Sequence, residues 1–388
     1  MDSVDALLDA ACDDTGRDDF GADGFREGLD VLVGSVDSEA DLNPIGEFIV
    51  RDLIMKALTN RLRIEDWYRR HPEIAEEVID PPLVGLGLPR TGSTALSFLL
   101  AEDPQARSLR RWEAAEPCPP PSTVEGTDPR IAAAEAQKEM MDAAAPRLAA
   151  LVPSTPTGPE ECQDLMALDF KSHYFQAFAH IPSYSRWFLD ADLTATYAYE
   201  QRALKLLQWG QPRRPWRLKC PTHLLFMPYL DAAFPDARYV WTHRDPSEVI
   251  VSVADLYAET MQMTSNTIDR AYLGRLNVEH WSTGMQRALD FRDASNDDRF
   301  FDLDFRTVQE DPLGSVHRLY EWLGEPVTPE FEAGMQRWWQ AEAANRAANT
   351  HPDPATFGLV KAELRPVFAN YINRAREWTA ASAAKSPI

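Results

Sequence analysis

Apolar residues recur at helical spacing along the N-terminal part of the chain. Residues 25–40 and 46–70 place apolar side chains three and four positions apart, which is the period of a helix with one buried face. This part carries no motif that suggests chemistry. We therefore predict that residues 1–80 form an N-terminal helical extension packed on a core domain of residues 81–388.

After Pro81 and Pro82, short apolar runs alternate with segments of helical period. The runs that we assign to buried strands are 83–88, 215–220, 237–244 and 299–305. The helices predicted between and after them include 93–103, 130–151, 221–235, 245–261 and 311–324. Short, almost wholly apolar strands that alternate with helices are typical of a parallel sheet that is covered on both faces. We therefore predict an α/β fold with a central parallel sheet and helices on both faces.

Composition narrows the class of partner. The chain of 388 residues carries a formal net charge of −22, has a pI near 4.8 and is 44% apolar, enough for one large domain with an extension. A chain this acidic repels DNA, RNA, anionic membrane surfaces and polyanionic sugars unless a local patch reverses the field. We therefore expect no nucleic-acid partner, and positive side chains beside glycine become the candidates for anion binding.

The cysteines form no CxxC pair and no other metal-ligand spacing; they are Cys12, Cys118, Cys162 and Cys220. This usage indicates reduced thiols, as in the cytoplasm. The acidic N-terminus lacks the basic and apolar segments of a secretion signal, and no apolar run reaches the ~20 residues that cross a bilayer. We predict a cytoplasmic protein with no integral membrane segment. The oligomeric state has no signature in the sequence.

The segment GLPRTGST, residues 87–94, follows the first apolar run and precedes a helix. Its glycines have the spacing of a phosphate-binding loop, in which backbone N–H groups surround an anion at the positive end of a helix. A Walker A loop carries lysine where this chain has Ser93. We predict an anion site; the alternatives are a structural turn and simple capping of the helix. The residues assigned to the anion are Arg90, Thr91, Gly92, Ser93 and Thr94.

The run 237–244 ends in Arg244, whereas the Walker B strand of a nucleoside triphosphatase ends in an acid that binds a metal. An arginine at this point suits an anion better than a metal. The missing lysine and the missing metal acid argue against an ordinary nucleoside triphosphatase or kinase. A nucleotide whose reactive group needs no metal fits better, and 3′-phosphoadenosine 5′-phosphosulfate (PAPS) meets that description.

Three motifs, in this order, resemble those of the sulfotransferase family, in particular its actinobacterial branch. GLPRTGSTAL (87–96) is similar to the 5′-phosphosulfate loop, RLKCPTHL (217–224) to a stretch with lysine, proline and histidine, and ARYVWTHRDPSEVIVS (237–252) to the 3′-phosphate site. Weaker similarity extends over residues 25–33, 61–74 and 351–374. The resemblance implies a P-loop-like sulfotransferase fold, PAPS as the sulfuryl donor and no metal.

The resemblance assigns Arg244 and Ser252 to the 3′-phosphate of the donor. The alternative for Arg244 is an ion pair with Asp245 or Glu248 at the start of the following helix. Two departures from the family pattern stand out. Many members carry lysine where this chain has Arg90, and the glycine-rich C-terminal donor segment of the animal enzymes has no clear counterpart, so the adenine contacts stay unassigned.

Lys219, His223 and Glu161 are the candidates for catalysis. Lys219 ends an apolar strand; by resemblance it stabilises the oxygen that bridges sulfur and the leaving phosphate, and otherwise it extends to solvent. An imidazole with a pKa near neutrality at His223 suits removal of a proton from an attacking hydroxyl, the alternative being a structural histidine. Glu161 is the rival base, or else an acid in the first turn of a helix.

Aromatic residues crowd the segment 171–188, which would either line an acceptor pocket or form the core of amphipathic helices. An acidic protein with an aromatic lining favours a neutral, apolar alcohol, phenol or lipid. Relatives in the branch act on lipids, polyketides and other hydroxylated metabolites, among which a hydroxylated menaquinone is one acceptor to consider. We predict a PAPS-dependent sulfotransferase with a small hydroxyl acceptor. The rivals are an ATP-dependent small-molecule kinase and a non-catalytic nucleotide-binding protein of the same fold.

Overall fold

The computed structural model describes residues 1–152, 154–294, 296–345 and 352–384, so His351 of the segment 351–374 lies outside the described residues. Within this part the chain forms two compact units. The helical unit comprises Met1–Ile79, Leu109–Arg213 and Tyr257–Ile268; the sheet unit comprises the described residues of Asp80–Ser108, Arg214–Leu256 and Asp269–Ile388. Whether residues 1–80 alone are a separable extension stays a prediction.

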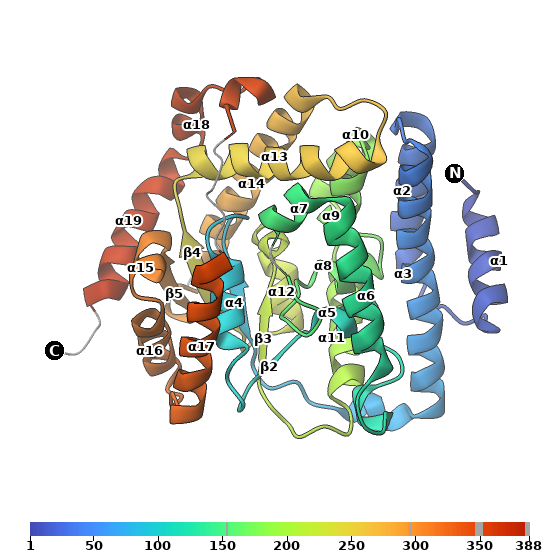
Figure 1. The fold of residues 1–388 in the computed structure, drawn as a ribbon, viewed down its shortest axis with the longest axis horizontal. Helices are drawn as coiled ribbons and strands as arrows, with labels where there is room; N and C mark the ends of the chain where they lie inside the picture. Colours follow the sequence, from blue (N-terminus) through green and yellow to red (C-terminus); the bar gives the residue numbers. More distant parts are fainter. Residues whose placement is uncertain (153, 295, 346–351, 385–388) are drawn as a thin grey trace. The chain divides into compact units, whose positions relative to one another are not determined.

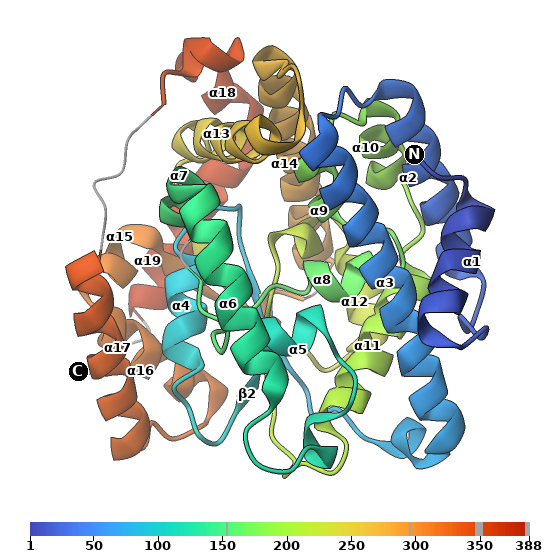
Figure 2. The same cartoon turned by 45° about the vertical axis from the view of Figure 1, so that its right-hand side comes forward.

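The helical unit is built from amphipathic helices with well-defined starts. Its elements are α1 (Val4–Thr15), α2 (Gly24–Glu39), α3 (Pro44–Arg70), η1 (Pro72–Glu76), α5 (Arg111–Ala115), η2 (Pro121–Thr123), α6 (Pro129–Ala144), α7 (Pro146–Leu151), α8 (Gln163–Ala167), α9 (His173–Phe178), α10 (Pro182–Leu189) and α11 (Thr194–Gln208). The Asn43 side chain accepts from the Gly46 N–H and so caps α3, along which α1 lies (Figure 2). The single helix predicted over 130–151 is wrong: it is α6 and α7, because Pro146 has no N–H to continue α6.

The aromatic segment 171–188 contributes rings to the core of the helical unit. Phe175, Tyr184 and Phe188 are buried. The Tyr184 ring stacks on Phe188 at 5.9 Å and meets Phe175 edge-on at 6.0 Å, and its hydroxyl donates to the carbonyl of Phe170. Core packing, the second of the two interpretations of this segment, therefore accounts for these three rings.

The sheet unit contains a parallel sheet of five strands among the described residues, in the order β2-β3-β1-β4-β5. The strands are β1 (Leu83–Leu86), β2 (Arg107–Ser108), β3 (Trp216–Lys219), β4 (Arg238–His243) and β5 (Phe300–Asp304). The helices are α4 (Ser93–Leu100), η3 (Pro221–Leu225), α12 (Met227–Ala233), α14 (Arg270–Asp293), η4 (Asp297–Arg299), α15 (Phe305–Glu310), α16 (Pro312–Leu323), α17 (Pro329–Asn345), η5 (Pro354–Phe357), α18 (Lys361–Val367) and α19 (Ala369–Ala384). The helix α13 (Pro246–Thr264) begins in the sheet unit, and its last turns belong to the helical unit. The predicted α/β fold with a central parallel sheet is confirmed.

Helices cover both faces of the sheet, as predicted. Alternate residues of a strand point to opposite faces. On β5, Phe301 and Leu303 join the apolar cluster formed with α4, α16 and α17, which lie side by side in Figure 1. Their neighbours Phe300 and Asp302 face α14 and α19: Phe300 lies 6.4 Å from the Phe291 ring, and Asp302 accepts from an arginine of α14.

The carboxyl ends of four strands lie at one edge of the sheet, and three of them lead to candidate residues. β1 leads into the loop at Gly87, β3 ends at Lys219, β4 is followed by Arg244, and β5 by Phe305. Parallel strands share this edge, where ligands of open α/β sheets usually bind. The helix predicted over 221–235 is in fact the 3-10 helix η3 followed by α12, so the chain turns sharply just beyond β3.

Within the described residues, no helix has the length and apolar character needed to cross a membrane.

The Gly87→Ala substitution tests the turn at the end of β1. Gly87 has φ 138°, and a Cβ atom there would lie 2.6 Å from the carbonyl oxygen of Thr242. We expect about 2–4 kcal/mol less stability in urea denaturation, from backbone strain and overpacking. The control Gly34→Ala in α2 adds a Cβ with no atom within 4 Å and should be neutral or slightly stabilising. Equal stability of the two variants would contradict this account.

Candidate functional site

The loop between β1 and α4 has the backbone of an anion cradle. Gly87, Arg90 and Gly92 all have positive φ, at 138°, 66° and 86°. The Thr91 hydroxyl donates to the Leu88 carbonyl at 2.7 Å, which closes the loop upon itself. A Cβ at Gly92 would lie 2.9 Å from a ring carbon of a phenylalanine, so glycine is required there. Glycine at this position thus allows the backbone to turn directly before the first turn of α4.

The first turn of α4 presents its backbone donors without a capping side chain. Gly92 is the N-cap residue, and among the described residues α4 has no side-chain capping hydrogen bond at this end. Ser93 is the first helical residue and is buried, whereas Thr94 is half-buried. The hydroxyl groups of Ser93 and Thr94 therefore do not cap α4, which was the alternative to binding an anion. Uncapped N–H groups at a helix N-terminus are suited to an anion.

Three residues predicted to bind the donor lie together in the sheet unit. The Arg90 Nε donates to Ser252 Oγ at 3.3 Å, and an Arg244 terminal nitrogen donates to the carbonyl of Arg90 at 3.0 Å. Ser252 reaches this point from the second turn of α13. The other terminal nitrogen of Arg244 lies 3.3 Å from Glu248, so the ion pair that was the alternative for Arg244 is also present.

Positive charge is concentrated at this point of a strongly acidic chain. Burial lowers the pKa of Arg90, and the neighbouring Arg244 lowers it further, whereas the Asp255 carboxylate raises it. The carboxylates of Asp255, near Arg90, and of Glu248, beside Arg244, thus partly offset the repulsion between the two arginines. An anion that entered the loop would offset it further.

Phe305 is a site residue that the sequence analysis missed. Its ring lies under the Arg244 guanidinium, 4.5 Å from the central carbon, and it is the ring that a Cβ at Gly92 would meet. It thus contacts both the loop and the second arginine. The available signal was weak: Phe305 is the last aromatic residue of the run 299–305, at the carboxyl end of β5.

Lys219 lies at the end of β3, directly beside β1. It pairs with Gly85, where a Cβ would lie 3.0 Å from the Lys219 Cγ. The glycine thus makes room for the aliphatic part of the lysine, which is buried. The interpretation that Lys219 simply extends to solvent does not hold.

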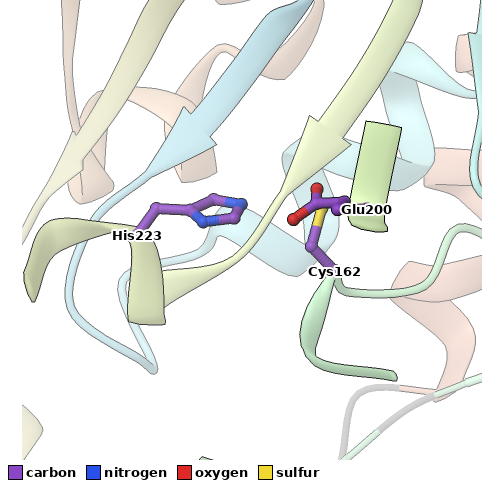
Figure 3. Close-up of side chains that lie close together, drawn as sticks. All are labelled: Cys162, Glu200 and His223. Atoms are coloured by element: carbon purple, nitrogen blue, oxygen red, sulfur yellow. The ribbon is translucent and has the colours of Figure 1, made fainter. Parts of the chain in front are cut away.

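His223 occupies η3, just beyond β3, and its ring projects from that turn in Figure 3. The side chain is fully buried, and burial lowers its pKa to about 3. The expected pKa near neutrality is therefore wrong for this ring. The imidazole is neutral at physiological pH, which leaves a lone pair available to accept a proton.

Glu161 belongs to the helical unit, two residues before α8. Its carboxylate accepts from the Gln163 side chain at 2.6 Å. Asp164, three residues on, has a pKa raised by burial and then by the Glu160 charge, against the opposing charge of Arg111. The segment thus holds, besides Glu161, the carboxyl group of Asp164, whose perturbed pKa the sequence analysis missed because burial is not visible in the sequence.

Glu200 is a buried acid of the helical unit with no motif around it. It lies on α11, and Figure 3 shows the Cys162 sulfur beside its carboxylate. Burial raises its pKa to about 7, and a hydrogen bond from the Cys162 thiol opposes the shift. The Cys162 thiol is also buried.

Comparison with known proteins identifies the class. Residues 81–329 match the sequence model of the sulfotransferase family, and the chain belongs to that family. The recognition from three motifs is thereby confirmed. The chain is accordingly a transferase of sulfuryl groups.

Mycobacterial sulfotransferases resemble it along most of its length. The crystal structure of sulfotransferase STF9 from Mycobacterium avium is 34% identical and superimposes with a TM-score of 0.89, covering 96% of this chain and 97% of that one. STF1 from Mycobacterium tuberculosis is 30% identical with a TM-score of 0.80, covering 95% and 99%. The omega-hydroxy-beta-dihydromenaquinone-9 sulfotransferase Stf3 of Mycobacterium bovis is 27% identical over 294 residues, 72% of this chain and 71% of that protein.

The Glu200→Gln variant tests the buried acid. The pKa of Glu200 is about 7 when folded, against 4.5 for the unperturbed group, so the folded chain holds the proton more tightly between these values. The contribution of the residue to stability is full below pH 4.5 and is lost as the pH rises through 7. At higher pH we expect the variant to exceed the wild type by on the order of 3 kcal/mol in urea denaturation. Glu135→Gln, at an exposed position, is the control, and a gain from Glu200→Gln that did not vary with pH would contradict this assignment.

Proposed function

We propose that this sulfotransferase moves a sulfuryl group from PAPS to a hydroxyl group of an apolar, lipid-like acceptor. The observation that carries the proposal is the meeting of Arg90, Arg244 and Ser252 beside an uncapped helix start. The donor carries a negative group at each end of its nucleoside. Two adjacent arginines and a row of backbone donors are the complementary set.

The loop would bind the 5′-phosphosulfate, through Arg90 and the backbone from Thr91 to Thr94. Arg244 and Ser252 would bind the 3′-phosphate. Donor binding then exchanges the contacts of Arg90 with Ser252 and of Arg244 with Glu248 for contacts to anions. Because both guanidinium groups are already held by these contacts, little side-chain freedom is lost on binding.

The transfer itself is an in-line displacement at sulfur. The acceptor oxygen forms the new S–O bond as the bond from sulfur to the bridging oxygen breaks, and adenosine 3′,5′-bisphosphate leaves with the electron pair. Lys219 at the sheet edge would stabilise the charge that grows on the bridging oxygen. The arginines and this lysine supply positive charge in the place that a metal takes in many phosphoryl transfers, so the proposal needs no metal.

The proton of the acceptor hydroxyl passes to a base, for which we propose His223 ahead of Glu161. The imidazole is neutral, and it lies just beyond the strand that carries Lys219. Its depressed pKa makes it a weak base in the resting state. It becomes a stronger base only when anionic donor groups stabilise the imidazolium.

The acceptor class rests on the similarity to Stf3. That relative is named for a hydroxylated menaquinone, and the identity is 27%. We propose a hydroxylated, lipid-like acceptor and name hydroxylated menaquinone as the first compound to assay. Labelled PAPS with a panel of hydroxylated lipids, phenols and alcohols is the test. Binding of the bisphosphate without transfer to any acceptor would favour a non-catalytic protein, and magnesium-dependent ATP turnover would favour a kinase.

Arg244→Ala tests the donor site. The variant loses charge-assisted hydrogen bonds to the 3′-phosphate, so we expect calorimetry to show affinity for adenosine 3′,5′-bisphosphate reduced roughly 10- to 100-fold. Arg306→Ala, at an exposed position of α15, removes an equal charge and is the control. Unchanged affinity in the Arg244 variant would remove the basis of the proposal.

His223→Gln and Glu161→Gln separate the two candidate bases. Loss of the base should lower kcat roughly 10²- to 10⁴-fold while the Kd for the bisphosphate stays the same. We expect this of His223→Gln and only a small change for Glu161→Gln. The reverse pattern would transfer the role to Glu161, and near-normal turnover of both variants would exclude both.

A further inference from the structure

A chain of buried polar groups lies behind Arg244, on the side of β4 that faces α14 and α19. His243 precedes Arg244, and its Nε2 lies 2.8 Å from the Asp302 carboxylate. Arg292 of α14 donates to both oxygens of Asp302, at 2.8 Å each. Burial would raise the pKa of Asp302, but hydrogen bonds from Arg292 and then from His243 outweigh it and lower the pKa to about 2. Asp302 is therefore ionised.

Tyr371 of the last described helix completes the chain. Its side chain is buried, and its hydroxyl lies 3.1 Å from His243 Nδ1. Burial raises the pKa of this hydroxyl, and the nearby backbone N–H of Arg244 opposes that shift. The ring is held between β4 and α19, 6.1 Å from the Trp241 ring and 5.7 Å from that of His243. The hydroxyl thus holds the ring of the residue directly before Arg244, at the end of β4.

The donors and acceptors of this chain have one consistent assignment when His243 is neutral. Ionised Asp302 accepts only, so His243 donates from Nε2–H. Its Nδ1 then carries a lone pair and accepts from the Tyr371 O–H. Each of these two contacts thus has one donor and one acceptor. The end of β4 directly before Arg244 is thus anchored to buried groups on β5, α14 and α19.

We propose that Tyr371 is a positioning residue for the 3′-phosphate site: its hydroxyl holds the His243 ring, which fixes the end of β4 and through it the direction of the Arg244 guanidinium. The inference rests on the proposed function, because it concerns the same arginine. It brings the C-terminal helix α19 into the donor site, although no residue of that helix needs to touch the donor. Arg244 is then restrained through its neighbour His243, which Tyr371 holds, and through its own side chain, which contacts the Arg90 carbonyl and the Phe305 ring.

Tyr371→Phe in the full-length chain removes the hydroxyl and keeps the ring. We expect affinity for adenosine 3′,5′-bisphosphate to fall roughly three- to tenfold by calorimetry, and kcat at saturating donor to stay nearly unchanged. Tyr320→Phe is the matched control, since Tyr320 is equally buried in the sheet unit and its hydroxyl bonds to Asp103 at 2.7 Å. Both variants should lose similar thermal stability, and only Tyr371→Phe should lose affinity.

Tyr371→Phe in an Arg244→Ala background tests whether the hydroxyl affects nucleotide affinity through Arg244. A positioning role predicts that Tyr371→Phe has no further effect on affinity once the guanidinium is gone. Equal weakening in both backgrounds, or the same loss of affinity in Tyr320→Phe, would overturn the inference. So would unchanged affinity of Tyr371→Phe while Arg244→Ala binds weakly. If Arg244→Ala binds as well as the wild type, it is the proposed function that fails, and the inference fails with it.

Discussion

Two guanidinium groups held close together in an acidic protein are the feature on which the site depends. Arg90 and Arg244 repel each other, and the chain offsets that repulsion with hydrogen bonds and with nearby acidic groups. The electrostatic free energy needed to hold the two guanidinium groups close together is lower when an anion lies between them than when none is present. In the proposed function that difference would contribute to the free energy of binding, and it would favour a ligand with more than one negative group.

The fold determines where this pair can form. In a parallel sheet the ends of β1, β3 and β4 share one edge, and each continues into a residue of the site. Glycine permits the first of these turns, because a Cβ at Gly87 would collide with the residue before His243. Gly85 makes room for the stem of Lys219 in the same way. The site therefore rests on strand ends, whose positions the sheet hydrogen bonds hold.

The sequence alone predicted the fold class, four of the five strands and the residues that gather around Arg90. It could do so because buried parallel strands are short apolar runs, and because glycine spacing marks a loop that surrounds an anion. The two-residue strand β2 was missed because it has no periodicity to detect. The contacts of Phe305 with Arg244 and of Tyr371 with His243 were missed because they join segments far apart in the chain. The pKa of His223 was misjudged because burial is a tertiary property.

The central claim is that separate groups of the chain bind the two ends of one bisphosphorylated adenosine. The most direct test is whether the protein distinguishes two nucleotides. Calorimetric titration would compare adenosine 3′,5′-bisphosphate with adenosine 5′-monophosphate, which lacks only the 3′-phosphate. The account predicts at least about tenfold tighter binding of the bisphosphate, the contribution of a charge-assisted phosphate contact. Equal affinity for the two nucleotides would show that no group of this protein recognises the 3′-phosphate, and would contradict the account.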